Sequence, residues 1–260
     1  MPGQVPMPIH SAPNCLNCGT ELRDAYCSKC GQSAHVPKFT WRYVLQELPV
    51  GIFAWDRGFL YTAQQLFTRP GKAIGTYISG ERVRHFRPLP LLAFCAGILG
   101  ILGLNLELPA SLADTPVKQQ GMKQVMDWIN SHYVWLELAL LPVMSFSTWV
   151  WFRKQGYNLV EHIIINSFLA AQRLMLNIVL FPVLMLSPGK QLMLGTGMVI
   201  NVASFGLFLW AFVQLFGQKN GIASATLRTL VAYAMGFILL GLIGGGIGGY
   251  LAMTGRLKMG

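Results

Sequence analysis

Five long apolar segments occupy most of the chain after residue 87, and short polar stretches separate them. We place them at about residues 88–107, 134–152, 159–186, 191–217 and 229–253. A membrane-spanning helix needs about 20 mostly apolar residues, so each segment is long enough to cross a bilayer. The last two are the clearest, because residues 191–218 and 229–255 carry no charged side chain. The pattern predicts an all-α membrane bundle of five transmembrane helices over residues 88–260.

The third segment carries a narrow polar stripe. At about 100° per residue, Asn166, Arg173 and Asn177 fall within about 60° of His162 on a helix. A charge near the middle of a bilayer costs at least ~2.5 kcal/mol. We therefore expect Arg173 to face the interior of the bundle or a wet cavity rather than lipid.

The second segment supplies a carboxylate at a matching depth. Arg173 lies about 18 Å along its helix from Glu161, and Glu137 lies about 22 Å from the same side of the membrane on the antiparallel second helix. A buried ion without its partner costs about 3–5 kcal/mol. We predict that Glu137 and Arg173 pair inside the bundle, with Asn166 and Asn177 completing their hydrogen bonds.

Glycines recur at helical spacing in two of the segments. Gly241, Gly245 and Gly249 form a ladder of small residues in the fifth segment, and a similar series lies in the first segment. Such ladders let membrane helices approach closely. Tight packing within one monomer is the favoured interpretation, and a homo-oligomer through the fifth span or a hinge is the alternative.

Residues 39–87 are less apolar than the spans but still patterned. Apolar side chains recur there at helical spacing, backed by Arg and Lys, and Pro70 suits the first turn of a short helix. This pattern predicts amphipathic helices next to the membrane. They either lie on the membrane surface or pack on the ends of the bundle, and the sequence favours neither.

Composition agrees with a membrane protein. Of the 260 residues, 53% are hydrophobic and only 12% are charged. The net charge of +10 could indicate nucleic acid, but half of the 20 Lys and Arg residues precede Pro88, where a basic segment beside a membrane span is typical. We therefore disfavour nucleic acid and expect a surface for anionic lipid head groups or a protein partner. Its candidate residues are Arg42, Arg57, Arg69, Lys72, Arg82, Arg84 and Arg87.

Four cysteines form the most specific motif in the chain. Cys15 and Cys18 make one Cys-x-x-Cys-Gly knuckle, and Cys27 and Cys30 make a second. Two-residue spacing lets both thiolates of a pair reach one tetrahedral Zn²⁺. We predict a structural zinc ribbon over residues 14–36, behind a disordered tail over residues 1–13. Redox dithiols and disulfides fit less well, because the two pairs are so close and the thiols are expected in the cytosol.

Positive charge predicts the orientation. With the N-terminus in the cytosol, fourteen Lys and Arg residues lie on the cytosolic side and five lie outside. The positive-inside rule then predicts a cytosolic N-terminus and an external C-terminus.

The stretch before and within the first segment also resembles a known family. The resemblance covers about residues 14–108, and its motifs are the two cysteine knuckles, Asp56-Arg57-Gly58-Phe59, Thr62, Leu66, Arg69-Pro70-Gly71, Tyr77-Ile78-x-Gly80-Glu81-Arg82 and Phe86-x-Pro88. The chain is similar to a bacterial family of zinc-ribbon, multi-pass membrane proteins without an established activity. Glu81 stands where that family usually has Lys. The resemblance implies a bacterial inner-membrane location and no particular activity.

Three functions follow from these patterns. The favoured one is a non-enzymatic membrane protein whose zinc ribbon docks a protein partner or anionic lipid in an assembly or regulatory role. The second is a transporter or flippase that moves an anionic substrate along the polar stripe, which a cavity reaching Arg173 would support. The third is an intramembrane enzyme that uses Glu161 and His162, although neighbouring residues point about 100° apart on a helix.

Overall fold

The computed structural model describes residues 13–47, 58–104, 116–186 and 190–253. Within these ranges the regular structure is helical, with two isolated β-bridges among the cysteine loops. This confirms the all-α prediction for the described residues. Predictions that concern Arg57 and the tail before Pro13 fall outside them.

Four helical stretches are long and apolar enough to cross a membrane, as in a multi-pass membrane protein. They are Tyr133–Gln155, Leu159–Met185, Leu194–Gln218 and Ile222–Gly246. The first comprises α6 (Tyr133–Phe152) and the short 3-10 helix η2 (Arg153–Gln155), and the others lie in α7 (Leu159–Met185), α8 (Lys190–Asn220) and α9 (Ile222–Met253). These match four of the five predicted spans.

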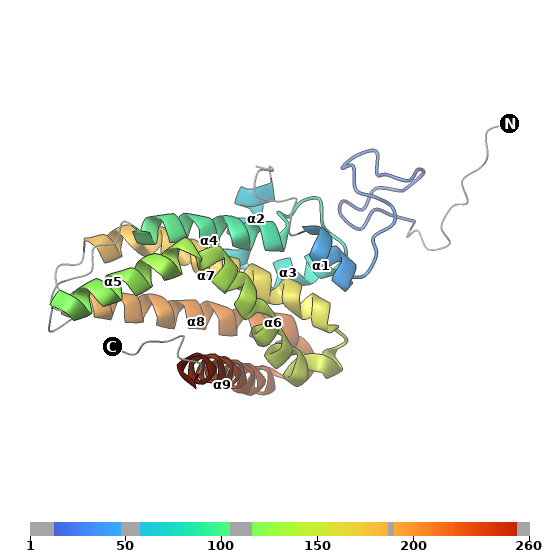
Figure 1. The fold of residues 1–260 in the computed structure, drawn as a ribbon. Helices are drawn as coiled ribbons and strands as arrows, with labels where there is room; N and C mark the ends of the chain where they lie inside the picture. The colour runs from blue at the N-terminus through green and yellow to red at the C-terminus, as the bar shows by residue number, and fades with distance from the viewer. Residues whose placement is uncertain (1–12, 48–57, 105–115, 187–189, 254–260) are drawn as a thin grey trace.

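The first predicted span is a shorter helix. Helix α4 (Pro88–Leu104) has 17 residues, or about 26 Å at 1.5 Å per residue. It packs along α7 and buries Leu91, Leu92 and Ala96 completely (Figure 1). An amphipathic helix that the apolar pattern does not predict, α5 (Pro116–Ser131), follows it and packs on α4 and α6. Five crossings therefore remain a prediction.

Before α4, three short helices pack against the bundle: α1 (Trp41–Glu47), α2 (Gly58–Thr68) and α3 (Pro70–Ser79). The amide of Gln172, which lies about 20 Å along α7, donates a hydrogen bond of 2.7 Å to the carbonyl of Leu66 at the end of α2. Leu66, Ile74 and Tyr77 are each 1% exposed. For α2 and α3, packing on the bundle is therefore the better of the two interpretations.

Gly71 allows the backbones of α3 and α8 to come into direct contact. Its N–H donates to the Gln214 side chain at 3.1 Å. A Cβ at this position would lie 2.7 Å from the Leu215 nitrogen and 2.8 Å from the Ala211 carbonyl oxygen. The Arg69-Pro70-Gly71 motif thus starts a helix and removes the side chain where the two helices cross.

The cysteine-rich loops project from one end of the bundle, which we call the ribbon end (Figure 1). This is the end where α6 finishes and α7 begins, since Asn158 donates to the carbonyl of Phe39 there at 3.3 Å. Phe152, Phe212 and Phe216 are fully buried near this end, and the rings of Phe152 and Phe216 stack at 4.3 Å. Aromatic packing therefore closes the space between α6 and α8 at the ribbon end.

The glycine ladders differ in their surroundings. In α4, a Cβ on Gly100 would lie 2.6 Å from the Asn130 carbonyl oxygen of α5, so this series packs within the chain. In α9, a Cβ added to Gly241 or Gly245 would meet no atom of the described residues within 4 Å. The described residues therefore offer these two glycines no packing partner within the monomer, and the choice between monomer packing and a homo-oligomer stays open.

Candidate metal centre and intramembrane polar cavity

The two cysteine knuckles have the same local structure, offset by twelve residues. The N–H of Gly19 donates to the carbonyl of Cys15, and the N–H of Gly31 donates to that of Cys27, each at 2.8 Å. Gly19 and Gly31 have φ values of 75° and 74°, a region that glycine adopts without strain. The β-bridge Asn14–Glu21 recurs as Tyr26–Ser33. Each pair of cysteines is therefore held by an equivalent backbone turn.

The two turns bring all four sulfur atoms together. The ligand atoms of Cys15, Cys18, Cys27 and Cys30 lie within 4.8 Å of one another. Cys15 and Cys30 Sγ are 3.6 Å apart, and Cys18 and Cys27 Sγ are 3.5 Å apart. Four thiolates about 2.3 Å from a tetrahedral Zn²⁺ would lie about 3.8 Å apart, so this group can hold a metal ion of that size.

The electrostatics at one ligand favour the thiolate, which is the form that binds metal. Hydrogen bonds to Thr20 lower the pKa of Cys18 to about 6, whereas burial raises the pKa of Cys30 to about 11. Four cysteines would fill a tetrahedral coordination shell, which leaves no open position for a reacting water. The arrangement is consistent with a structural metal site.

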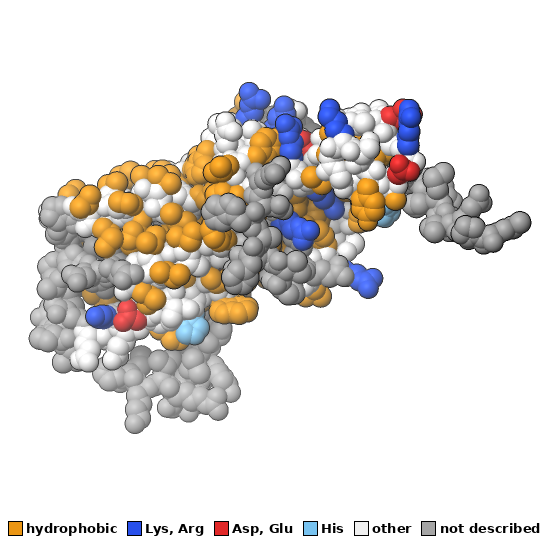
Figure 2. Space-filling view, turned by 90° about the horizontal axis from the view of Figure 1, so that it is seen from above, with side chains coloured by type: hydrophobic (Ala, Val, Ile, Leu, Met, Phe, Trp, Pro, Cys, Tyr) orange, Lys and Arg blue, Asp and Glu red, His pale blue; other side chains and the backbone are white. Residues whose placement is uncertain are grey.

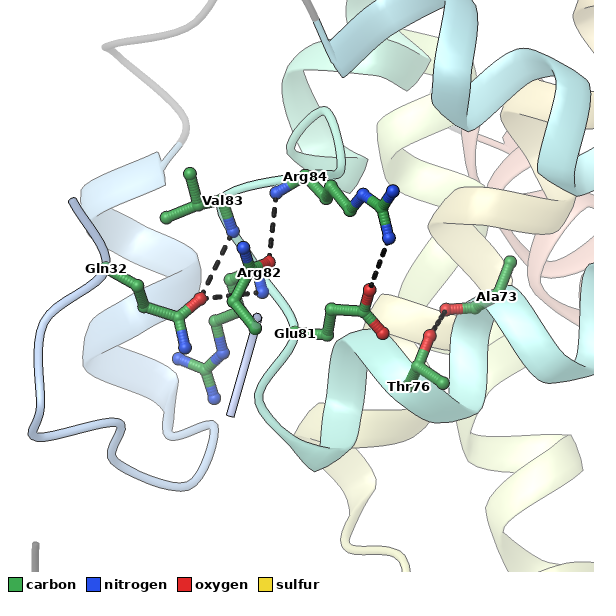
Figure 3. Close-up of polar contacts among 8 residues, drawn as sticks. Gln32, Ala73, Thr76, Glu81, Arg82, Val83 and Arg84 are labelled. Carbon is green, nitrogen blue, oxygen red and sulfur yellow. Dashed lines mark hydrogen bonds and ion pairs between the residues drawn. The ribbon is translucent and has the colours of Figure 1, made fainter. Parts of the chain in front are cut away.

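The cysteine module (residues 14–36) is attached to the bundle through the turn at residues 80–84 (Figure 3). Gln32, only 3% exposed, donates to the carbonyl of Gly80 at 2.8 Å and accepts the N–H groups of Arg82 at 3.1 Å and Val83 at 3.3 Å. From the first knuckle, Asn17 accepts the N–H of Arg84 at 3.3 Å. Both knuckles therefore contact the same turn.

Arg82 is half-buried and contacts the segment that follows the cysteine module. Its guanidinium lies 3.9 Å from the centre of the Phe39 ring and donates to the carbonyl of Pro37 at 2.7 Å. Arg82 thereby ties the segment after the cysteine module to the 80–84 turn.

His85 follows this turn and is buried. Desolvation, with the positive charge of Arg84 beside it, lowers the pKa of His85 to about 4. Its ring makes edge contacts with Tyr61 and Tyr77. We conclude that a neutral imidazole packs here as an aromatic ring.

The other described basic candidates are exposed, namely Arg42, Arg69, Lys72, Arg84 and Arg87. Arg84 also forms an ion pair of 3.6 Å with Glu81. Figure 2 shows most visible Lys and Arg side chains gathered at the ribbon end, whereas hydrophobic side chains cover much of the remaining face. The positive charge is concentrated where the cysteine module lies.

Inside the bundle, Glu137 and Arg173 form the expected ion pair. Arg173 Nη2 lies 2.7 Å from both carboxylate oxygens of Glu137. Tyr133, one turn before Glu137 on α6, lies close enough to both members of the pair to feel their charges. Tyr133 and Glu137 are four residues apart and therefore lie on the same face of the helix. This spacing is the sequence signal that could have placed Tyr133 beside the ion pair.

The asparagines have other partners than predicted. Asn177 donates to the carbonyl of Arg173 at 2.7 Å, and Asn166 donates to Thr148 Oγ1 at 2.9 Å. His162 Nδ1 also lies 3.1 Å from Thr148 Oγ1. The polar stripe therefore divides into two parts, an ion pair that includes Arg173 and a cluster in which His162 and Asn166 contact Thr148. The division arises because α6 places the Thr148 hydroxyl beside the half of the stripe that is nearer the ribbon end.

A cavity of about 290 Å³ connects the two groups near the middle of the bundle. It is lined from α6, α7, α8 and α9 by apolar side chains and several polar ones. The polar residues are Glu137, Asn166, Arg173, Asn201, Ser204 and Tyr233. Asn201, Ser204 and Tyr233 were not predicted from the sequence, since isolated polar residues of this size are ordinary in membrane helices.

Comparison with protein families gives one match. Residues 56–100 match the model of a family described as "Protein of unknown function (DUF3667)". The matched stretch includes the Arg69-Pro70-Gly71 motif and the 80–84 turn, whereas the two cysteine knuckles and the four long apolar helices lie outside it. Comparisons with the curated proteins and with the solved structures gave no match.

Proposed function

We propose that this chain is a non-enzymatic, multi-pass protein of the bacterial inner membrane whose zinc-bound cytosolic module docks a protein partner in an assembly or regulatory role. The attachment of both cysteine knuckles to the 80–84 turn carries this proposal. A module held in one orientation on the bundle can present a defined surface. A tethered module would lose more conformational entropy on binding.

The proposed orientation places this surface in the cytosol. Fourteen Lys and Arg residues then lie on the cytosolic side, in keeping with the positive-inside rule. The reducing cytosol also keeps cysteine thiols available for zinc.

The module exposes apolar side chains and charged side chains of both signs, which suits a protein–protein interface. Tyr26 is 66% exposed and Leu16 is 49% exposed, and both belong to the knuckles. Arg23 and Lys29 are exposed nearby in sequence. Aromatic residues and Arg are the types enriched at protein interfaces.

Photo-crosslinking in living cells tests the proposal. The photoreactive residue p-benzoylphenylalanine replaces Tyr26 in the full-length protein, and a matched control replaces Trp128, an exposed aromatic residue of α5. We expect a discrete protein adduct at position 26, absent at position 128 and lost when Cys27 and Cys30 are both changed to Ser. If the probe captures lipid and no protein, the result would contradict a protein partner and would favour an anionic membrane surface as the binding target. An adduct that survives loss of the cysteines would contradict docking through a zinc-ordered module.

The enzyme hypothesis fits the geometry less well. Glu161 forms a capping box with Asn158, in which its Oε2 accepts the Asn158 N–H at 2.8 Å. His162 instead bonds to Thr148 on α6. The two residues thus serve different partners and do not converge on a common point.

Transport is a second candidate, because the cavity reaches Arg173. A path for an anionic substrate would use the cavity and require the aromatic packing at the ribbon end to open. Reconstitution of the purified protein into vesicles tests this function with a fluorescent anionic phospholipid. A protein-dependent rise in its flipping rate supports transport, and a rate equal to that of empty vesicles contradicts it.

A further inference from the structure

The polar cavity contains one negative and one positive side chain that compensate each other. Glu137 is almost completely buried, whereas a third of the Arg173 side chain remains accessible. A ligand with a single net charge would leave an excess charge in a region of low dielectric, which is costly. A zwitterion leaves the total charge at zero and can place an anionic group near Arg173 and a cationic group near Glu137.

A buried hydroxyl in the cavity lacks a partner. Ser204 is 6% exposed, and its Oγ has no hydrogen-bond partner among the described residues. A buried hydroxyl without a partner is unfavourable, so this group is available to bind a ligand or an ordered water. Asn166 and Tyr233 add amide and phenol groups to the same lining.

The cavity also reaches the outer surface of the bundle. Leu140, Asn201 and Phe237 line it and are themselves exposed, and Phe237 is 58% exposed. Along α8, Asn201 lies about 10 Å from Leu194, where the apolar stretch of that helix begins. Along α9, Phe237 lies about 14 Å from Gly246, where the apolar stretch of that helix ends. Both depths fall within the roughly 30 Å hydrocarbon layer. A lipid can therefore enter sideways while its acyl chains remain in the bilayer.

We infer that this cavity binds the head group of a zwitterionic phospholipid, with the phosphate at Arg173, the ammonium at Glu137 and a hydrogen bond to Ser204. A volume of about 290 Å³ is at the lower end of the range for ligand pockets and suits a head group rather than a whole lipid. This site is independent of the docking function proposed for the cysteine module.

Native mass spectrometry of the full-length protein in detergent tests the inference. The probes are dihexanoyl phosphatidylethanolamine, its anionic phosphatidylglycerol analogue, dihexanoylglycerol and free phosphoethanolamine. We expect phosphatidylethanolamine to bind at least tenfold more tightly than each of the other three. Equal or tighter binding of phosphatidylglycerol or dihexanoylglycerol would overturn the zwitterionic assignment. Equal binding of free phosphoethanolamine would overturn the assignment to a lipid.

Matched variants locate the site. Ser204→Leu fills the cavity and should weaken phosphatidylethanolamine binding at least tenfold. Ala203→Leu adds a bulky side chain to an exposed neighbour outside the lining and should change the affinity less than twofold. Unchanged binding by Ser204→Leu would overturn the site. If Ser204→Leu does not fold, p-benzoylphenylalanine at Phe237 should capture phosphatidylethanolamine from native membranes, and failure to capture it would overturn the site equally.

Discussion

At the residue scale, the ion pair between Glu137 and Arg173 predicts strong coupling between two mutations. Glu137→Gln or Arg173→Gln alone leaves one charge without its partner and should cost about 3–5 kcal/mol of folding free energy. The double variant removes both charges and should recover most of this loss. The yield of folded protein and its melting temperature in detergent measure the effect. Additive losses in the double variant would contradict a coupled pair.

Gln32 provides a second residue-scale prediction. Gln32→Ala removes three hydrogen bonds to the 80–84 turn and should weaken the attachment of the cysteine module by about 2–4 kcal/mol. Limited proteolysis of the full-length protein should then cut between the module and α1 several-fold faster. The control is Gln64→Ala, at an exposed position on α2, which should leave the rate unchanged. Equal cleavage rates in the wild type, Gln32→Ala and Gln64→Ala would show that Gln32 does not hold the module.

The residues of the site were predictable to different degrees. The pairing of Glu137 with Arg173 followed from the depths of two charges on antiparallel helices, because helical rise is fixed. The partners of Asn166 and Asn177 did not follow. A short amide bonds to whichever group lies nearest, and the hydroxyl of Thr148 was positioned by the packing of α6 against α7.

At the scale of elements, the close crossing of α3 and α8 explains the glycine of the Arg69-Pro70-Gly71 motif. Gly71→Ala would press a methyl group against the backbone of α8 and should destabilise the protein by about 1–3 kcal/mol. Gly75→Ala, one turn later, meets only the end of the Leu215 side chain at 3.3 Å and should change stability by less than about 1 kcal/mol. Melting temperatures of the two variants measure the difference. Equal tolerance at both positions would contradict the close crossing of α3 and α8.

The long helices were predictable from apolar length alone, and the four described spans match the expected positions within several residues. Helix α5 was not predictable in this way, since it is amphipathic and packs on α4 through the backbone near Asn130. The sequence also could not tell whether α2 lies on the membrane surface or packs on the bundle. The contact that favours the bundle joins Leu66 to Gln172, which lies 106 residues later in the sequence.

At the scale of the whole molecule, the number of crossings sets the side on which the C-terminus lies. If α4 crosses with the four longer helices, a cytosolic N-terminus requires an external C-terminus. An alkaline phosphatase reporter fused after Gly260 should therefore be active, and one fused after Gly221, between α8 and α9, should be inactive. An inactive reporter at Gly260 would show that α4, at about 26 Å, does not cross the membrane.

The metal in the cysteine module is central to the proposed function. The four sulfur atoms within 4.8 Å predict one zinc per chain, bound through sulfur alone. Elemental analysis of the freshly purified full-length protein measures this ratio directly, with a variant in which all four cysteines are Ser as the blank. We expect one zinc per wild-type chain and none in the variant. A ratio well below one, or disulfides among Cys15, Cys18, Cys27 and Cys30, would contradict the zinc-ordered module and the docking function built on it.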